Sequence, residues 1–314
     1  MKTSPYVTRT FLIACSLCFL SSGQAWDGCG HKTVAAIAFD QLSAKAKKKV
    51  NAIFKKDKRG RHFIDAATWP DDIKLGHRND LPVKAHLDKP WHFVDIPYDA
   101  SEQAIDEELS NHGKTPDQAH PDSANVVTAI GFFTAQLKSG AGDATVQADA
   151  LSWLIHLVGD VHQPLHCVTV LHPLDNYTPP AKGDEGGNGF NIHHPAHELH
   201  ALWDDTFDEP TGGRDGEGRD SSDENAKNIA SDLESRIHPA AAALALSRPA
   251  EWAKESYAFR TFAYNPAVAQ NTAAKNPAHT ITDDYLRSAR KVAEERVVLA
   301  GNRLAKLIES IYGQ

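Results

Sequence analysis

The stretch WLIHLVGDVHQPLH, residues 153–166, decides the fold that the sequence predicts. It closes the most apolar helical segment of the chain, which we expect to be a buried helix. His156 and Asp160 lie four residues apart and therefore share one face of that helix. A carboxylate among apolar residues is costly, and a metal ion would compensate for it because imidazole and carboxylate are zinc ligands. Pro164 ends or bends the helix, so His166 can turn back toward the same site.

Helical patterns occupy most of the chain on either side of this stretch. Apolar residues recur at helical spacing before it and again in a long charged segment near the C-terminus. Strand signals are scarce, although residues 168–171 and 189–192 could pair as a short β-hairpin. The expected fold is all-α, a single compact helical domain. The expected helices cover 33–42, 43–56, 123–137, 143–161, 196–208, 222–246, 249–264 and 283–311, with loops at 97–121 and 209–225.

The first 25 residues have the pattern of a secretory signal peptide. Two basic residues precede an apolar run, Phe11 to Leu20, and Gly23-Gln24-Ala25 supplies a small-residue cleavage site. The run is too short to be a spanning helix. A lipoprotein site at Cys15 is the weaker alternative, because the apolar core before it is too short. Cleavage after Ala25 leaves one domain, residues 26–314, that begins at Trp26 and is secreted or periplasmic.

Composition limits how this chain can hold a charged partner. It has 314 residues, 41% hydrophobic and 24% charged, which is typical of a globular protein. The formal charge of −8 falls to −10 once the two basic residues of the signal are removed. Such a chain does not hold nucleic acid by bulk charge, although metal ions can still grip phosphate. From Lys45 to Arg61, however, nine basic residues face one acid, Asp57. This segment is either a solvated helix face, the simpler interpretation, or a polyanion-binding patch.

A second His-x3-Asp pair follows the first. His200 and Asp204 repeat its spacing on another expected helix. One such pair can be a plain helix salt bridge, but two in one chain, with one in an apolar helix, indicate a metal cluster. A zinc-storage protein would close its coordination with protein ligands, whereas an enzyme would leave positions open to substrate. Both interpretations remain open at this point.

Further motifs carry a resemblance to a known family. The chain has ATWPDDIK at residues 67–74, WHFVD at 91–95 and Gly186-Gly187-Asn188 before the second pair. With the expected N-terminal Trp26 and the 153–166 motif, they resemble in order the S-one/P-one family of zinc-dependent single-strand nucleases and 3′-nucleotidases. Zinc-dependent phospholipases C are more distant relatives of that family. The resemblance implies a phospholipase C/nuclease-like fold that holds three zinc ions.

The resemblance also implies how the ligands divide among the three zinc ions. The carboxylate of Asp160 bridges two of them, which share a hydroxide that becomes the nucleophile, so that Asp160 takes part in catalysis. The third ion would help to neutralise the charge of the phosphate. The first ligand group is Asp71, His92, His156 and Asp160; the second is His166, His200 and Asp204; the third is Trp26, His31 and the other oxygen of Asp160.

Catalytic and substrate-binding roles are implied at five more positions. Lys74 matches a basic residue that steadies the phosphate, and Asp95 matches a carboxylate beside the nucleophile. Phe93 would stack on a base, since stacking does not depend on base identity. Gly187 and Asn188 would read a base edge. Each has a plainer alternative: a surface lysine, a hydrogen bond to a ligand, core packing and a turn.

The cysteines mark a departure from the family pattern. Fungal and plant members carry several in the segment that matches residues 99–122, where this chain has none, which suggests a bacterial-type member. Cys29 precedes His31 by two residues, and Cys167 directly follows His166. If both histidines serve one cluster, the two thiols are neighbours, and we expect a disulfide between them.

The resulting expectation is a secreted zinc-dependent endonuclease, a phosphoric ester hydrolase. Its substrates would be single-stranded DNA, RNA and 3′-nucleotides, with 5′-nucleotides as the products of the nucleic acids. We expect a monomer without stable membrane association, because no membrane-facing amphipathic stretch stands out. The alternatives are a phospholipase C, disfavoured because its corresponding ligand is Glu where this chain has Asp204, and a non-catalytic zinc-binding protein.

Overall fold

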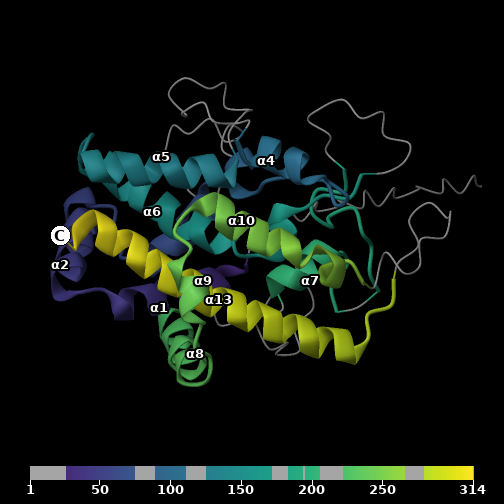
Figure 1. Ribbon diagram of the computed structural model, residues 1–314. Helices are drawn as coiled ribbons and strands as arrows, with labels where there is room; N and C mark the ends of the chain where they lie inside the picture. Colours follow the sequence, from purple (N-terminus) through teal and green to yellow (C-terminus); the bar gives the residue numbers. More distant parts are fainter. Residues whose placement is uncertain are drawn as a thin grey trace, which may run out of the picture.

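The computed structural model describes residues 26–74, 89–110, 125–171, 183–193, 195–205, 222–265 and 279–313, and most of these residues are helical (Figure 1). Outside helices, backbone pairing among them is limited to isolated bridges. The expected all-α fold is therefore confirmed. No helix in these ranges is both long enough and apolar enough to cross a membrane. The expected signal peptide lies outside the described residues.

Two long helices cross the middle of the molecule. Helix α6 (Ala144–Asp160) carries the first metal motif, and α13 (Asp283–Tyr312) packs across it and against α1 (Gly28–Gln41) (Figure 1). The approach of α13 to α1 depends on Gly301, where a Cβ would lie 2.5 Å from Ile37 Cγ2. A larger residue at that position would push the helices apart.

Shorter elements surround this pair. Helix α5 packs on α6, α8 covers α1, and α2 reaches both α6 and α13. One turn of 3-10 helix contains the first two residues of the WHFVD motif, and another begins at Pro164, just after the end of α6. The remaining elements are α2 (Ala44–Asp57), η1 (Asp65–Ala67), α3 (Trp69–Lys74), η2 (Lys89–His92), α4 (Glu102–Ser110), α5 (Val126–Ser139), η4 (Pro164–Cys167), α7 (Leu199–Asp205), α8 (Asp223–Arg236), α9 (Ala241–Ala245), α10 (Pro249–Ala258) and α11 (Arg260–Ala263).

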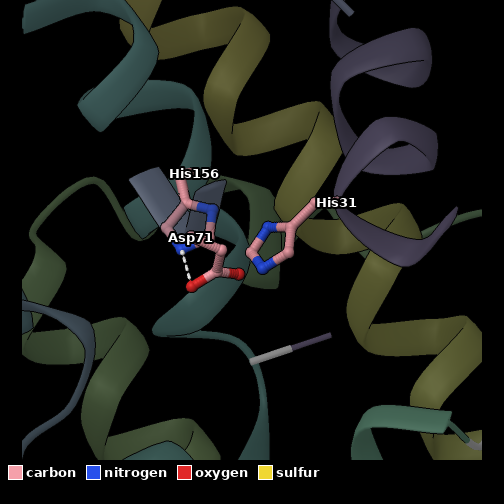
Figure 2. Close-up of side chains that lie close together, drawn as sticks. All are labelled: His31, Asp71 and His156. Atoms are coloured by element: carbon pink, nitrogen blue, oxygen red, sulfur yellow. Dashed lines mark ion pairs between the residues drawn. The ribbon is translucent and has the colours of Figure 1, made fainter. Parts of the chain in front are cut away.

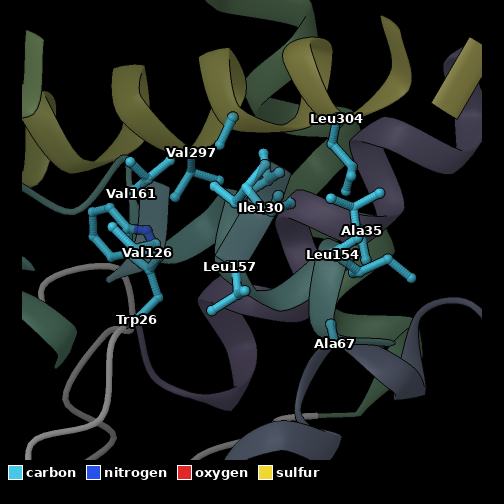
Figure 3. Packing of buried hydrophobic residues seen from close by; sticks show 14 of the residues in the cluster. Trp26, Ala35, Ala67, Val126, Ile130, Leu154, Leu157, Val161, Val297 and Leu304 are labelled. Atoms are coloured by element: carbon cyan, nitrogen blue, oxygen red, sulfur yellow. The ribbon is translucent and has the colours of Figure 1, made fainter. Parts of the chain in front are cut away.

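The core explains why the end of α6 is so enclosed. Leu154 and Leu157 of α6 pack with Ala35 of α1 and with Val297 and Leu304 of α13 (Figure 3). Every residue of α6 from 150 to 160 is buried, polar ones included. A histidine and a carboxylate on this helix therefore have no access to bulk water. They need compensating partners inside the protein.

Helix boundaries follow local chemistry. Ser43 and Asp143 begin α2 and α6 as N-caps, since their side chains accept hydrogen bonds from backbone N–H groups. The expected helix 222–246 is instead two helices, because Pro239 lies between α8 and α9 and cannot continue the first. The expected loop at 97–121 contains α4, which sequence polarity concealed.

The expected β-hairpin is wrong. Thr169 bridges to Pro97, and Asn191 bridges to Glu198, so neither segment pairs with the other. The amide of Val170 instead donates to the Asp184 side chain at 2.7 Å. The Val170 amide thus donates its hydrogen bond to a buried carboxylate instead of to a carbonyl of a second strand.

Candidate metal centre

The site is built around the last turn of α6. His156 and Asp160 are fully buried there. The Nδ1 atom of His156 lies 2.8 Å from the carbonyl oxygen of Ala67 and must donate to it, because a carbonyl only accepts. The opposite ring nitrogen, Nε2, then faces the carboxylates of Asp160 and Asp71 at 3.2 and 3.8 Å. The backbone thereby fixes the ring's tautomer and its direction.

Two other histidines repeat this arrangement. His166 Nδ1 donates to the His92 carbonyl at 2.7 Å, and His200 Nδ1 donates to the Gly186 carbonyl at 2.8 Å. Each ring therefore turns a lone-pair nitrogen inward. A metal-ligating histidine characteristically donates its other N–H in this way, which orients the ring and raises its basicity. Three rings oriented alike are a stronger indication of a metal site than the His-x3-Asp spacing alone.

Asp160 joins two groups of histidines. Its Oδ1 lies 3.3 Å from His31 Nε2, while its Oδ2 lies 3.0 Å from His92 Nδ1 and 3.2 Å from His156 Nε2. The two oxygens thus face different partners, which is the geometry of a bridging carboxylate. Figure 2 shows His31, Asp71 and His156 converging from three separate elements. The rings of His31 and His156 stack with centroids 3.9 Å apart.

Three groups of side chains in the described residues are close enough to hold an ion. In each, the potential ligand atoms lie within 4.8 Å of one another, and every member is buried. The second matches the expected first ligand set without Asp71, and the third matches the expected second set. The groups are His31, Asp71 and His156; His92, His156 and Asp160; and His166, His200 and Asp204.

Trp26 lies against this centre. Its indole Nε1 donates to the Gly159 carbonyl at 3.0 Å, and the next amide, that of Asp27, donates to the Asp204 carbonyl at 3.1 Å. The start of the expected mature chain is thus fastened to both ligand-bearing helices. Gly30 permits the contact, because a Cβ there would lie 2.8 Å from Trp26 Cβ.

The donor atoms suit a divalent transition metal. His166 Nε2 and His31 Nδ1 are buried and make no hydrogen bond within the described ranges. Such buried polar atoms are uncommon and call for a partner. All side-chain donors in the three groups are imidazole nitrogens or carboxylate oxygens, with no thiolate, which is the set that zinc takes in hydrolytic sites. The residues therefore fit a metal ion.

The pKa values of the buried groups agree with that fit. Burial lowers the pKa of His166 to about 3, so its ring is neutral and able to bind a metal. Burial alone would raise the pKa of Asp160, but the adjacent His156 holds it well below its ordinary value. Burial opposes protonation of His156, yet Asp160 and Asp71 raise its pKa to about 9. A proton therefore occupies the place that a cation would otherwise fill.

Asp204 is held by the residue between the two helix motifs. The Gln163 side-chain amide donates to Asp204 Oδ1 at 2.8 Å, and Asp204 Oδ2 lies 3.5 Å from His200 Nε2. Burial raises the pKa of Asp204 well above its ordinary value, so an ionised carboxylate there needs a positive partner. Gln163 fixes one carboxylate oxygen and leaves the other directed at the histidine.

A tight loop supplies the carbonyl that orients His200. Gly186 and Gly187 have φ angles of 68° and 89°, in the region that glycine adopts without strain. A Cβ at Gly186 would collide with the carbonyl oxygen of Leu165. The Gly-Gly motif therefore has a structural role here, whether or not it also reads a base. Asn188 is partly exposed beside it and donates to the Glu185 carbonyl at 2.6 Å.

Asp184 and Tyr264 anchor that loop, and sequence analysis missed both. The Tyr264 hydroxyl donates to Asp184 Oδ2 at 2.8 Å, and the carboxylate also accepts the Thr169 hydroxyl at 3.3 Å. Both Asp184 and Tyr264 are buried. In the sequence, the one feature that could have pointed to Asp184 was its position two residues before a Gly-Gly pair. Its buried phenol partner, 80 residues away, left no trace in the sequence.

The expected substrate residues are less enclosed than the ligands. Phe93 and Asp95 are partly exposed, and the Phe93 carbonyl accepts the Val126 amide at 3.1 Å. Burial, together with the charges of Asp184 and two glutamates, raises the pKa of Asp95 well above its ordinary value. Lys74 is the last residue of α3, and its side chain lies outside the described part of the structure.

The expected disulfide is absent, since neither Cys29 nor Cys167 is disulfide-bonded and both are buried. Cys29 Sγ faces α8, where the Asn225 amide approaches it at 3.7 Å. Cys167 Sγ instead faces the Val161 carbonyl at 3.5 Å. The histidines beside them do converge, but the thiols lie on other faces of their elements and point to different neighbours. Burial raises the pKa of Cys167 to about 12, so it remains a neutral thiol.

Known proteins resemble this chain in sequence. The chain matches the family described as S1/P1 Nuclease over residues 26–313. Nuclease S1 of Aspergillus oryzae is 26% identical over 203 residues, which cover 64% of this chain and 60% of that protein. Endonuclease 4 of Arabidopsis thaliana is 24% identical, with 93% of this chain and 91% of that protein covered. Nuclease P1 of Penicillium citrinum is 23% identical, with 92% and 98% covered. The chain thus spans less than two thirds of the Aspergillus protein and nearly all of the other two.

Proposed function

Because the chain belongs to the S1/P1 nuclease family, we propose that it is a zinc-dependent nuclease that hydrolyses single-stranded DNA and RNA to 5′-nucleotides. We also assign it 3′-nucleotidase activity. The observation that carries the proposal is the buried carboxylate of Asp160, whose two oxygens face different groups of histidines. Such a centre suits a phosphate ester, because several positive charges can be held near one anionic group.

The proposal assigns three zinc ions to the centre. Zinc bound there would neutralise phosphate charge and lower the pKa of water to about 7. The orphaned nitrogen of His166 and the inward-facing rings support this assignment. One ion would be held by Asp71, His92, His156 and Asp160, a second by His166, His200 and Asp204, and the third by Trp26, His31 and Asp160.

The chain's own residues prepare the centre for this chemistry. Backbone carbonyls hold the rings of His156, His166 and His200, so no reorganisation is needed when a substrate arrives. Asp95, whose pKa is raised, would exchange a proton beside the phosphate. Lys74 would steady the phosphate as a point charge.

Single-strand preference follows from the residues beside the centre. Phe93 would offer a ring face on which a base stacks, and Gly187 with Asn188 would contact the base edge. Both Phe93 and Asn188 are partly exposed, so a base can reach them. A base inside a duplex has no free face, whereas an unstacked base does. The enzyme should therefore act faster on single strands than on duplexes.

Secretion and a single-domain mature protein belong to the same proposal. Residues 1–25 would be removed as a signal peptide, which would free the α-amine of Trp26 as a ligand. The tight seating of the Trp26 side chain under Gly159 supports this. We assign the mature protein, residues 26–314, to the secreted or periplasmic space as a monomer without membrane association.

The test combines metal analysis with hydrolysis on one sample of mature protein that begins at Trp26. We expect about three zinc ions per chain and chelator-sensitive release of 5′-nucleotides from single-stranded DNA and RNA. Asp160→Asn should lose metal and activity together. His238→Ala, which changes an exposed histidine of the same chain, should retain both.

Other results would redirect the proposal. One zinc ion or none in the active protein would overturn the ligand assignment. A full complement of zinc without nuclease activity, but with release of the headgroup from phosphatidylcholine, would make the protein a phospholipase C. Full zinc with neither activity would indicate a zinc-binding protein.

A further inference from the structure

Helix α2 carries a row of exposed lysines. Lys45, Lys48, Lys49, Lys55 and Lys56, here called the lysine stripe, are all exposed. At 100° per residue these positions fall within an arc of about 120°, and at 1.5 Å per residue they extend over about 16 Å. The spacing therefore places five positive charges along one face of one helix.

The opposite face of α2 is buried in the core, so the row of lysines faces outward. Val50, Ile53 and Phe54 are buried there and belong to the main core. The same burial disfavours insertion into a membrane, because a helix that lies in a bilayer surface must bury its apolar face in lipid. The apolar face of α2 is already taken by the protein, so the lysine stripe presents charge alone.

The lysine stripe also lacks internal counter-charges. Within the described residues, none of its five ammonium groups forms an ion pair with a carboxylate. The one acid of the segment, Asp57, is buried and is paired with Arg59 and Arg61. The stripe is therefore a concentrated positive field on a chain whose formal charge is −8. Such a local field attracts a polyanion even when the net charge does not.

The N-terminal end of the lysine stripe is remote from the metal centre, whereas the C-terminal end of α2 lies nearer to it, since Asp57 pairs with Arg61 and Arg61 contacts Ser152 of α6. His31 lies at the start of α1, and α2 follows the far end of that helix (Figure 1). With 14 residues, α1 is about 21 Å long. A mononucleotide at the centre cannot reach the lysines, whereas a strand of many nucleotides can span both.

We propose that the lysine stripe is a second, sequence-independent binding site for the phosphate backbone of long single-stranded nucleic acid. The inference rests on the proposed nuclease function, which makes a polynucleotide the polyanion that this protein meets. Lysines act as point charges toward phosphate and release bound counterions when they contact it. The stripe holds a long strand near the centre and contributes nothing to the chemical step.

The test compares two triple variants of the mature protein. Lys45, Lys49 and Lys56 are changed to Gln in the first; Lys138, Lys227 and Lys291, three exposed lysines on other helices, are changed to Gln in the matched control. Fluorescence anisotropy follows binding of a 30-nucleotide single-stranded phosphorothioate DNA at several salt concentrations. Hydrolysis of long RNA and of 3′-AMP is measured in parallel.

The expected result is specific to the stripe. The slope of log affinity against log salt should fall by about 2 in the first variant, since each lost phosphate contact contributes about 0.7 for single strands. Its kcat/KM should fall on long RNA and stay unchanged on 3′-AMP. The control should match the wild type throughout. Loss of long-strand binding would support the stripe even if neither protein cleaved RNA, an outcome that would refute only the proposed nuclease function.

Two results would overturn the inference. One is equal binding of the 30-mer, with equal salt dependence, by the first variant and the wild type. The other is lysine-dependent binding to vesicles containing phosphatidylserine without binding to the 30-mer, which would make the stripe a membrane contact instead.

Discussion

Replacing Gly159 by alanine tests the packing that seats His31. An ideal Cβ at this position would lie 2.8 Å from His31 Nδ1 and 3.1 Å from its Cε1. His31 is buried, so the ring cannot move aside without displacing its neighbours. Overpacking of this kind costs about 1–3 kcal/mol, whereas replacing glycine by alanine inside a helix is otherwise favourable by about 0.5–1 kcal/mol. The net expectation is a loss of up to about 2.5 kcal/mol of unfolding free energy.

The same displacement should remove one metal position. If His31 swings away from Asp160 Oδ1, now 3.3 Å from it, the group that includes Trp26 loses its imidazole. Zinc content should then fall from about three ions per chain to about two, while the His166 group keeps its ion. Elemental analysis and thermal unfolding of the same preparation measure both effects, and turnover of 3′-AMP should fall with the metal.

Gly131 provides the matched control. It lies inside α5, and a Cβ there would meet no atom within 4 Å. Gly131→Ala should therefore stabilise the protein by about 0.5–1 kcal/mol and keep its full zinc content. The reasoning is refuted if Gly159→Ala also raises the melting temperature and retains all of its zinc. The close contact between the new Cβ and the His31 ring would then have no physical consequence.

Three further outcomes are expected. Mature protein that begins at Trp26 should show two reactive thiols when it is denatured without reduction, and a single disulfide on mass analysis would contradict this. The native mature protein should show none at pH 8, because Cys29 and Cys167 are buried and the pKa of Cys167 is raised to about 12. Burial and two nearby arginines lower the pKa of His162, so below pH 6.5 the unfolded state binds the proton more readily and stability falls on acidification. His162→Gln should remove up to about 1.4 kcal/mol per pH unit of that loss, and an unchanged pH slope in urea titrations would argue against it. Gly186→Ala should release the loop that orients His200, because its Cβ collides with the Leu165 carbonyl; zinc content at the wild-type value would count against that role.

Local spacing carried most of the prediction of the fold. The 3.6-residue recurrence of apolar positions located α6 and α13 to within a residue or two, and Ser43 marked the start of α2 through its capping chemistry. Helix α4 was missed because it is polar. Its apolar face consists of only Ile105 and Leu109, which lie one turn apart and are both buried.

Contacts between distant segments were less predictable. The family resemblance named the expected ligands, and the structure brings the side chains of His31, Asp71 and His156 together. The resemblance could not indicate that Asp184 and Tyr264 hold the loop behind His200. It also could not indicate that Cys29 and Cys167 point to different neighbours. Closeness in sequence to two converging histidines does not imply closeness of the thiols, since adjacent side chains leave a helix about 100° apart.

The sequence by itself determined that this chain is helical and that two His-x3-Asp pairs share helix faces, because these are properties of neighbouring residues on one element. Only the tertiary structure decided which carbonyls orient His156, His166 and His200. It also places the two oxygens of Asp160 toward different groups of histidines, as the family resemblance implied. The carbonyl contacts join residues up to 89 positions apart, and Asp160 lies 129 positions from His31 in the sequence. They form because core packing brings the segments together, and no local pattern records which backbone group will meet which ring.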